Sequence, residues 1–244
     1  MTQIVRHTVV SPHSDDAAFS VGSLLLTEGA EAQVITICAG RPDDDSAAAD
    51  WDWRCGFRTA GQAATVRRAE DSAACRSVGA SVCHLSYPDA PYAPERSAAD
   101  LPDELEQLLA GTTVWLPAAI GGHPDHVLTR NAVLAVLRRT ALPALLYADT
   151  PYASACGWRT ADDDRDDAFR WASALGGVTA QGFELSDPVW HILDHSAAAA
   201  KIKLARHYAS QLCGLGQHYP GLTRVDGDLA TEVHWHLRHV DGRV

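Results

Sequence analysis

The sequence predicts an α/β fold: a Rossmann-like, doubly wound, mostly parallel sheet with helices on both faces. Two observations carry this prediction. Short β-branched apolar runs alternate with longer segments of helical apolar spacing, and strands that alternate with helices build parallel sheets covered on both sides. The chain has 244 residues, 46% of them hydrophobic, which is enough for one large core. We therefore expect a single domain over residues 1–244.

The expected elements follow one another in a regular order. Short apolar runs predict strands at residues 7–11, 34–38, 81–85, 113–117 and 144–148. Apolar residues at helical spacing predict helices at residues 16–28, 65–78, 127–139 and 201–211. Gly79 is expected to close the second helix, because glycine adopts the left-handed conformation that ends many helices. The segment HWHLRH, with His234, His236 and His239, is expected to form a C-terminal strand with half-exposed histidines.

Two stretches fall outside this alternation. Residues 41–57 are polar, contain Trp51 and Trp53, and directly follow a predicted strand, where active-site loops of parallel sheets lie. A surface insertion without a functional role is the alternative. Residues 160–170 are strongly acidic, and we expect a solvated loop or the start of a helix there.

Charge and composition exclude several functional classes. The chain has 20 Lys and Arg against 31 Asp and Glu, and its formal charge of -11 disfavours nucleic acid and anionic membranes as partners. No apolar run approaches the roughly 20 residues of a membrane helix, and no secretory signal is recognisable, so we expect a cytoplasmic protein. Six cysteines are scattered without a C-x-x-C pair, which argues against a Cys-ligated zinc site and against a disulfide framework.

Two polar clusters stand out from the rest of the chain, at residues 12–16 (PHSDD) and 122–126 (GHPDH). Each follows a predicted strand and precedes a helix. Loops after the carboxyl ends of neighbouring parallel strands converge on one crevice, so the two clusters are expected to face each other. Catalytic zinc sites use three nitrogen or oxygen ligands from the protein and leave a further position open, which two histidines and one aspartate satisfy.

The clusters hold more donors than a metal needs. With two adjacent aspartates, one is expected to bind the metal and the other to act as a general base toward water. The remaining histidine is expected to stabilise an oxyanion or to protonate the leaving amine, oriented by Asp125.

These motifs carry a resemblance to a known family. His13-Ser14-Asp15-Asp16 and His123-Pro124-Asp125-His126 resemble the paired motifs of the PIG-L/LmbE-like zinc-dependent N-acetylglucosaminyl deacetylases. Further stretches are similar to recurring segments of that family: residues 67–70, 78–80, 147–152 and 201–211. The resemblance implies a Rossmann-like sheet and zinc as the cofactor, although imidazole and carboxylate also suit Fe²⁺. It implies that His13, Asp16 and His126 bind the metal, that Asp15 is the base, and that Asp125 supports His123.

The chain departs from the family pattern at two positions. Ser14 stands where Pro is most common, and Ala17 stands where Glu is most common. Neither position binds the metal in the family, so we expect metal binding to be kept. The missing carboxylate at Ala17 removes a contact around the site and suggests a branch whose substrate differs from that of the best-known members.

The function expected from this reasoning is hydrolysis of an N-acyl amide, N-acetyl above all, on an amino sugar or glycosylated small molecule. An amidase acting on a thiol conjugate or peptide-like natural product is the alternative within the same chemistry. A non-catalytic metal- or nucleotide-binding α/β module is the alternative from another class, but a glycine-rich nucleotide loop does not follow the first strand. The sequence gives no indication of the oligomeric state.

Outside the two clusters, a few aromatic residues, one glycine and several isolated histidines are further candidates for contacts with substrate or metal. Trp51 and Trp53 are candidates to contact substrate because aromatic rings stack on sugars, and Gly122 because a glycine allows close approach to the backbone. His191 and His195 are expected to be structural, although a shared helix would give them ligand spacing. His84 and Tyr208 are expected to be structural as well.

Overall fold

The computed structural model describes residues 5–42, 46–93, 98–156 and 168–240. Its described strands form one eight-stranded sheet in the order β3-β2-β1-β4-β5-β8-β6, with β7 paired to β8. The first five strands in this order are parallel, and β8 is antiparallel to β5, β6 and β7. The strands are β1 His7–Ser11, β2 Ala32–Thr36, β3 Ser81–His84, β4 Thr113–Pro117, β5 Ala144–Tyr147, β6 Phe183–Leu185, β7 Val189–Ile192 and β8 Thr231–His239.

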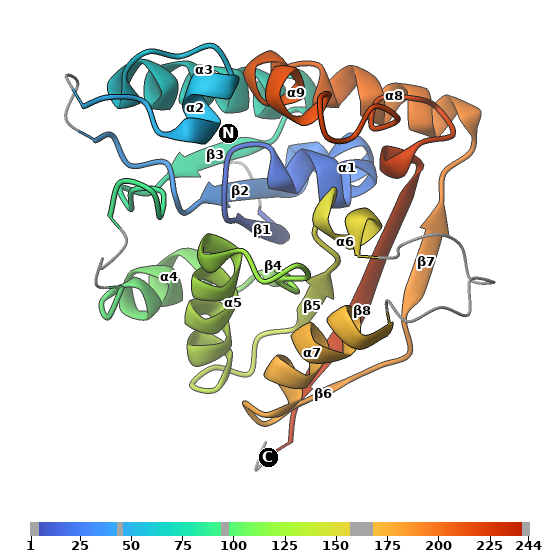
Figure 1. Cartoon of the computed structure of the whole chain (residues 1–244). Helices are drawn as coiled ribbons and strands as arrows, with labels where there is room; N and C mark the ends of the chain where they lie inside the picture. Colours follow the sequence, from blue (N-terminus) through green and yellow to red (C-terminus); the bar gives the residue numbers. More distant parts are fainter. Residues whose placement is uncertain (1–4, 43–45, 94–97, 157–167, 241–244) are drawn as a thin grey trace.

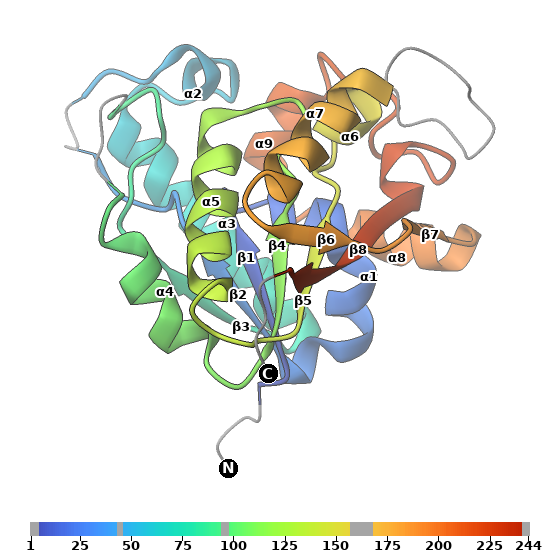
Figure 2. The same ribbon diagram turned by 90° about the horizontal axis from the view of Figure 1, so that it is seen from below.

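Helices cover both faces of this sheet, as the two perpendicular views show (Figures 1 and 2). The helices α1 Asp16–Glu28, α3 Ala60–Val78, α8 His195–Ala205 and α9 Ala209–Leu215 lie on one face. The helices α4 Leu101–Leu109, α5 Pro124–Leu137 and α7 Ala168–Thr179 lie on the other. The short elements are α2 Asp50–Arg54, α6 Tyr152–Ala155 and the 3-10 turns Gly29–Glu31 and Asp228–Ala230.

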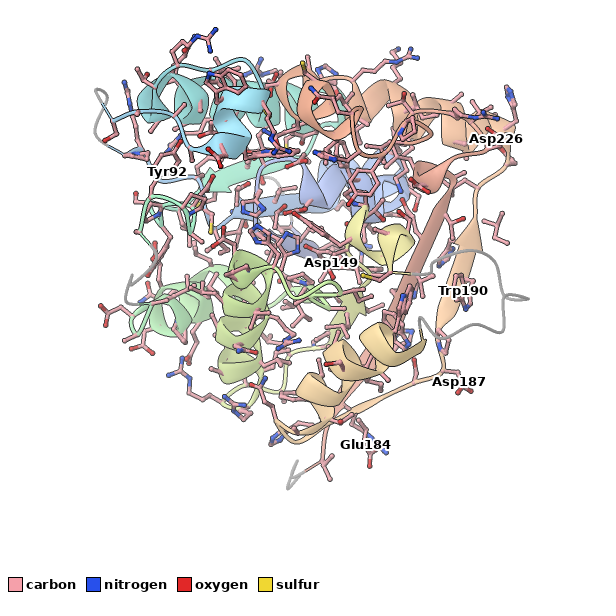
Figure 3. The ribbon with its side chains drawn as sticks, viewed as in Figure 1. Tyr92, Asp149, Glu184, Asp187, Trp190 and Asp226 are labelled. Carbon is pink, nitrogen blue, oxygen red and sulfur yellow. The ribbon has the colours of Figure 1, made fainter. Side chains whose placement is uncertain are left out.

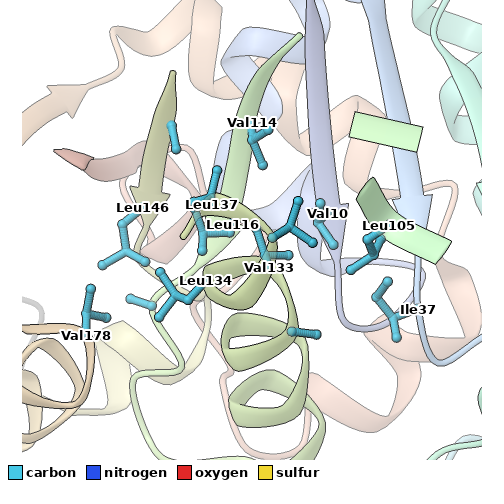
Figure 4. Packing of buried hydrophobic residues seen from close by; sticks show 14 of the residues in the cluster. Val10, Ile37, Leu105, Val114, Leu116, Val133, Leu134, Leu137, Leu146 and Val178 are labelled. Carbon is cyan, nitrogen blue, oxygen red and sulfur yellow. The ribbon is translucent and has the colours of Figure 1, made fainter. Parts of the chain in front are cut away.

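Alternating side chains of each parallel strand feed two apolar layers. Val9 packs toward α1, α3 and α8, whereas its neighbour Val10 packs toward α4 and α5. Figure 4 shows the second layer, in which Val10 and Leu116 from the sheet meet Val133 and Leu134 of α5. Because helices cover both faces, β1 and β5 carry apolar residues at successive positions, as in Val9-Val10 and Leu145-Leu146, in place of a strict apolar–polar alternation.

The first half of the chain follows the sequence prediction closely. The bounds of β1, α1 and β4 are those predicted, and Gly79 ends α3 with φ +81. The strand predicted at residues 34–38 lies two residues earlier, at 32–36. The α3 helix begins at Ala60 rather than residue 65, because the Thr59 side chain accepts a hydrogen bond from the backbone N–H of Gln62 and caps an earlier turn.

Two predictions about local structure are wrong. The 122–126 cluster is not all loop: Pro124 begins α5, so Asp125 and His126 lie in its first turn. The helix predicted at 201–211 is two helices, since the chain leaves helical geometry at Tyr208. The shared helix that would have given His191 and His195 ligand spacing does not form, because His191 lies in β7 and only His195 begins α8.

The segments outside the alternation are resolved in part. Residues 50–54 within the predicted 41–57 loop form α2, so this stretch is not wholly irregular; residues 43–45 lie outside the described residues. Of the acidic run 160–170, only the backbone of 168–170, at the start of α7, is described. HWHLRH lies in β8, as predicted. Over the part of the chain that the structure describes, helices long and apolar enough to cross a bilayer are absent.

Candidate metal centre and active site

The two polar clusters meet at the carboxyl-terminal edge of the parallel strands. His13 follows β1, His126 lies in the first turn of α5 after β4, and Asp149 follows β5. These strands are neighbours in the sheet, so their ends bring together residues that are more than 100 positions apart in the sequence. The ring centroids of His13 and His126 are 5.3 Å apart. The clusters therefore face each other across one edge of the sheet.

His13, Asp16 and His126 present a compact set of donor atoms. Asp16 Oδ2 lies 3.2 Å from His13 Nδ1 and 3.3 Å from His126 Nε2. One donor atom from each of the three residues lies within 4.8 Å of the others. Asp16 also accepts a hydrogen bond from the backbone N–H of His13 at 2.8 Å, which fixes the carboxylate at the start of α1.

This donor set fits a divalent cation. Two imidazoles and a carboxylate are ligands that Zn²⁺ and Fe²⁺ accept. His126 is fully buried, and its Nε2 atom, although 3.3 Å from Asp16 Oδ2, makes no hydrogen bond to the described residues. A buried, unpaired ring nitrogen is costly, and a bound cation would satisfy it. Burial opposes ionisation of Asp16, but the neighbouring His126 and His13 outweigh it and lower the pKa of Asp16, so the carboxylate is charged.

Asp149 orients His126 from the other side of the ring. Its Oδ1 atom lies 2.6 Å from His126 Nδ1, and its Oδ2 atom accepts the backbone N–H of Ile120 at 3.1 Å. Asp149 is fully buried beside α6 (Figure 3). A carboxylate in this position leaves Nε2 free to bind a metal. Asp149 is not among the site residues predicted from the sequence. Its position directly after the strand predicted at residues 144–148 is the sequence signal that could identify it.

Asp15 lies beside the donor set, outside its three members. It is buried and lines the same cavity as His13 and Asp16. Burial and the neighbouring negative charge of Asp16 raise the pKa of Asp15 to about 7. A carboxyl group with a pKa near neutrality can both accept and return a proton.

Asp125 contacts a different histidine from the one predicted. Its Oδ2 atom lies 2.9 Å from His13 Nε2, but 3.9 Å from His123 Nδ1. The contact between Asp125 and His123 is instead made by the backbone, since the Asp125 N–H donates to His123 Nδ1 at 3.3 Å. Asp125 therefore orients His13, and His123 caps the amino-terminal end of α5.

The neutral form of His123 has a defined tautomer. Its Nδ1 atom accepts the Asp125 N–H, so the ring proton of neutral His123 is on Nε2. Burial, with the nearby His13 and His126, lowers the pKa of His123 to about 4. At neutral pH this ring is an uncharged hydrogen-bond donor.

A cavity of about 330 Å³ opens over these residues. His13, Asp15, Asp16, His123 and Asp125 lie in its wall. The other walls of the cavity come from α3, α2 and α9, which contribute Arg67, Trp51 and Gln211 respectively. The lining residues that the sequence reasoning did not select include Cys38, Asp52, Asp89, Tyr92, Tyr152, Gln211 and Tyr219.

Arg67 of α3 is the main positive charge in the cavity wall. Its guanidinium pairs with Asp52 of α2 and lies 3.1 Å from Asp89. Tyr92, labelled in Figure 3, donates its hydroxyl proton to Asp52. This group ties the α2 segment to the loop after β3. None of the four side chains lies in the two polar sequence clusters, so the sequence prediction does not include this group.

The three suggested substrate contacts occupy different places. Trp51 lines the cavity, and its Nε1–H donates to Gln211 Oε1 at 3.1 Å. Trp53 is 61% exposed and lies outside the lining residues, with the Arg58 guanidinium 5.7 Å from its ring centroid. Gly122 is also outside the lining residues; its φ of +73 serves the turn before α5.

The two departures from the family pattern are both buried at the start of α1. Ser14 lines the cavity. Ala17 packs in the apolar layer beneath α1, and its backbone N–H donates to Ser11 Oγ at 3.0 Å. Ser11 Oγ in turn donates to the His13 carbonyl at 2.6 Å. The loop that presents His13 is thus held from below by a hydroxyl group.

The positions predicted to be structural have internal partners. His84 Nε2 lies 2.9 Å from Asp71 Oδ2, and the Tyr208 hydroxyl donates to Asp71 Oδ1 at 3.0 Å. Thr36 Oγ1 donates to the same carboxylate at 2.7 Å. Asp71 thus links α3, β2 and the start of α9 beneath the sheet edge. The described cysteines are all free, and most are buried.

Comparison with known proteins adds independent information. Residues 8–137 match the family model described as PIG-L, GlcNAc-PI de-N-acetylase. A 2'-N-acetylparomamine deacetylase from Streptomyces fradiae is 32% identical over 169 residues, which are 61% of this chain. The match spans 58% of that relative's length.

Solved structures match over nearly the whole chain. The A40926 pseudoaglycone deacetylase Dbv21 is 29% identical, with a TM-score of 0.69 over 98% of this chain and 99% of the other. A triple mutant of a deacetylase involved in teicoplanin biosynthesis is 24% identical, with a TM-score of 0.76 over 98% of this chain and 100% of the other. The second likeness bears on the fold alone.

Proposed function

The chain belongs to the PIG-L family of de-N-acetylases, and we propose that it is a metal-dependent hydrolase that removes an N-acetyl group from an amino sugar or a glycosylated small molecule. The single observation that carries the proposal is the set of His13, Asp16 and His126 donor atoms within 4.8 Å of one another, two of whose residues, His13 and Asp16, line the same cavity as Asp15. The deacetylase relatives support the reaction class, and the N-acetylparomamine and pseudoaglycone in their names support a glycosylated small molecule as substrate.

His13, Asp16 and His126 would hold the cation, and we propose zinc as its identity. When bound, such a cation polarises the acyl carbonyl and makes water more acidic. Asp149 and Asp125 have a positioning role, because each contacts a ring nitrogen of a proposed ligand, His126 and His13 respectively.

Asp15 moves the proton in the proposed reaction. Its carboxylate accepts a proton from the water that attacks the acyl carbon, and the carbon–nitrogen bond then breaks. The same carboxyl group returns that proton to the departing amine nitrogen, so acetate and a free amine are formed. The position of Asp15 beside Asp16, in the cavity wall, supports this role.

His123 stabilises the oxyanion of the tetrahedral intermediate. Because its Nδ1 atom accepts the Asp125 N–H, the Nε2–H is available to donate a hydrogen bond. A fixed donor of this kind lowers the barrier by about 2.7–4 kcal/mol in other acyl-transfer enzymes. Protonation of the amine is assigned to Asp15 rather than to His123, since the His123 ring is uncharged.

The experiment compares Asp15→Asn with the wild type. We expect this variant to bind as much zinc as the wild type, with unchanged affinity, and to lose about 10²–10⁴-fold in kcat, because the proton acceptor is gone. Asp187→Asn is the matched control, since Asp187 is exposed, lies between β6 and β7 (Figure 3) and is not among the residues that line the cavity. Turnover by Asp15→Asn within threefold of the wild type would contradict the assignment.

The substrate class is tested separately, with a panel of N-acetylated amino sugars, glycopeptide pseudoaglycones and N-acetylated thiol conjugates. Acetate release should be greatest with the first two classes. Faster release from thiol conjugates would favour the alternative amidase. A protein that binds zinc and releases no acetate from any member would favour a non-catalytic metal-binding role.

A further inference from the structure

A second set of metal-binding side chains lies beside the proposed centre. His13, Cys38, Asp89 and Asp125 each offer a donor atom, and these atoms lie within 4.8 Å of one another. They come from four places in the chain: the loop after β1, the segment after β2, the loop after β3 and the first turn of α5. This dispersion is why the cysteine spacing argued against a thiolate ligand.

The two sets use opposite nitrogens of the His13 ring. Nδ1 lies 3.2 Å from Asp16 Oδ2, on the side of the first set, whereas Nε2 lies 2.9 Å from Asp125 Oδ2, on the side of the second. Asp16 and His126 belong only to the first set, and Cys38 and Asp89 only to the second. The sets are therefore adjacent and distinct.

The second set is built into the protein rather than scattered over its surface. Asp125 is fully buried, and its Oδ2 atom also accepts the Ala90 N–H at 3.2 Å. Cys38 is 6% exposed, and its backbone N–H donates to the Pro12 carbonyl at 2.9 Å. Arg67 contacts Asp89 at 3.1 Å. All four donor residues line the cavity, so a cation can reach them from solvent.

We propose that Cys38, Asp89, Asp125 and His13 form a second site for a thiophilic divalent cation such as Zn²⁺ or Cd²⁺. A thiolate beside an imidazole suits these ions and disfavours Mg²⁺ and Ca²⁺, which prefer oxygen ligands. Binding forms a metal–sulfur and a metal–nitrogen bond and releases the Cys38 thiol proton and the His13 Nε2 proton to solvent. With both sites filled, the His13 ring bridges the two cations.

Occupation of this site inhibits the proposed reaction. A cation bound there replaces the hydrogen bond between Asp125 and His13 Nε2, and it occupies part of the cavity that Asp15 also lines. This consequence rests on the proposed function. The existence of the second site does not, because it can be counted without turnover.

The test counts cations on the full chain. Metal-free protein is titrated with Zn²⁺ and with Cd²⁺, and bound metal is measured by elemental analysis after desalting. With Cd²⁺, ultraviolet absorption from thiolate-to-metal charge transfer reports the cysteine ligand. We expect two equivalents in the wild type, with the absorption accompanying one of them.

Three variants identify the sites. Cys38→Ser should bind one equivalent and lose the absorption. Cys213→Ser, which removes an exposed cysteine outside both sets, should behave as the wild type. His126→Ala should lose the first site and keep the absorption. One equivalent in the wild type, or two in Cys38→Ser, would overturn the proposal.

Turnover then separates this proposal from the proposed function. Each protein's rate is normalised to its own rate at one equivalent of zinc. Excess zinc should inhibit the wild type at least tenfold and Cys38→Ser less than twofold. Turnover that is insensitive to excess zinc, with one metal bound per chain, refutes only the second site. Binding of two metals at saturation, with no acetate release even at one equivalent of zinc, would refute only the deacetylase.

Discussion

Asp149→Asn offers a quantitative test of how the metal ligands are held. In the wild type, His126 Nδ1 lies 2.6 Å from Asp149 Oδ1, and both side chains are fully buried. The substitution keeps the size of the side chain but replaces a charged acceptor with a neutral amide. His126 is then held less firmly, and its Nε2 atom becomes a weaker metal ligand.

The expected magnitude follows from this geometry. Loss of a carboxylate that orients a ligating histidine costs about 10–100-fold in metal affinity. That factor corresponds to roughly 1.4–2.7 kcal/mol of binding free energy. We expect the upper part of this range, because the Asp149–His126 pair is shielded from water and the Asp149 carboxylate also accepts the Ile120 N–H.

The assay is competition for zinc with a fluorescent chelator of known affinity. Asp71→Asn is a matched control, because Asp71 is also a fully buried carboxylate in contact with a histidine, His84, but lies outside the cavity lining. This control should lower the stability of the fold and leave zinc affinity unchanged. Zinc affinity of Asp149→Asn within twofold of the wild type would refute the reasoning.

Three further predictions concern stability and the cavity wall. Lys201→Ala should cost about 3–5 kcal/mol in urea unfolding, because it removes the positive charge 2.7 Å from the buried Glu232 carboxylate, which then keeps its hydrogen bonds from Ser23 but loses its ion pair; a loss below 1 kcal/mol would contradict this. Gly214→Ala should raise KM with little effect on kcat, since the new Cβ would lie 2.8 Å from Cys55 Sγ and push α2 from the cavity; an unchanged KM would argue against it. Burial opposes protonation of His126, but the carboxylates of Asp16 and Asp149 outweigh burial and raise the pKa of His126 to about 9. The protonated ring therefore stabilises the metal-free protein fully below pH 6.5, and this stabilisation is lost as pH rises through 9. The thermal unfolding temperature of the metal-free wild type should fall between pH 6 and pH 9.5 because of this loss, and that contribution should be missing in His126→Ala.

Much of the fold was accessible from sequence because local signals agreed with the final packing. The HTVVS run followed by Pro12 placed both β1 and the start of α1, and the left-handed Gly79 marked the end of α3. The start of α3 at Ala60 differs from the predicted start at residue 65, although Thr59 and Gln62 have the spacing of a capping box. Gly61 in the first turn had weakened the helical pattern.

The remaining features depended on tertiary contacts. The antiparallel position of β8 beside β5 is set by pairings such as Leu146 with Trp235, which no local pattern encodes. The same holds for the site: the motifs marked the two clusters, but not that Asp125 would contact His13 rather than His123. Asp149 and Cys38 join the site only because neighbouring strands end at one edge.

An anomalous scattering map of zinc-loaded crystals tests the central claim most directly. We expect a zinc peak about 2.0–2.2 Å from His126 Nε2, from an Asp16 carboxylate oxygen and from a ring nitrogen of His13. The Asp15 carboxylate should not be a ligand. A map in which the strongest zinc peak lacks His126 or Asp16 as a ligand would contradict it.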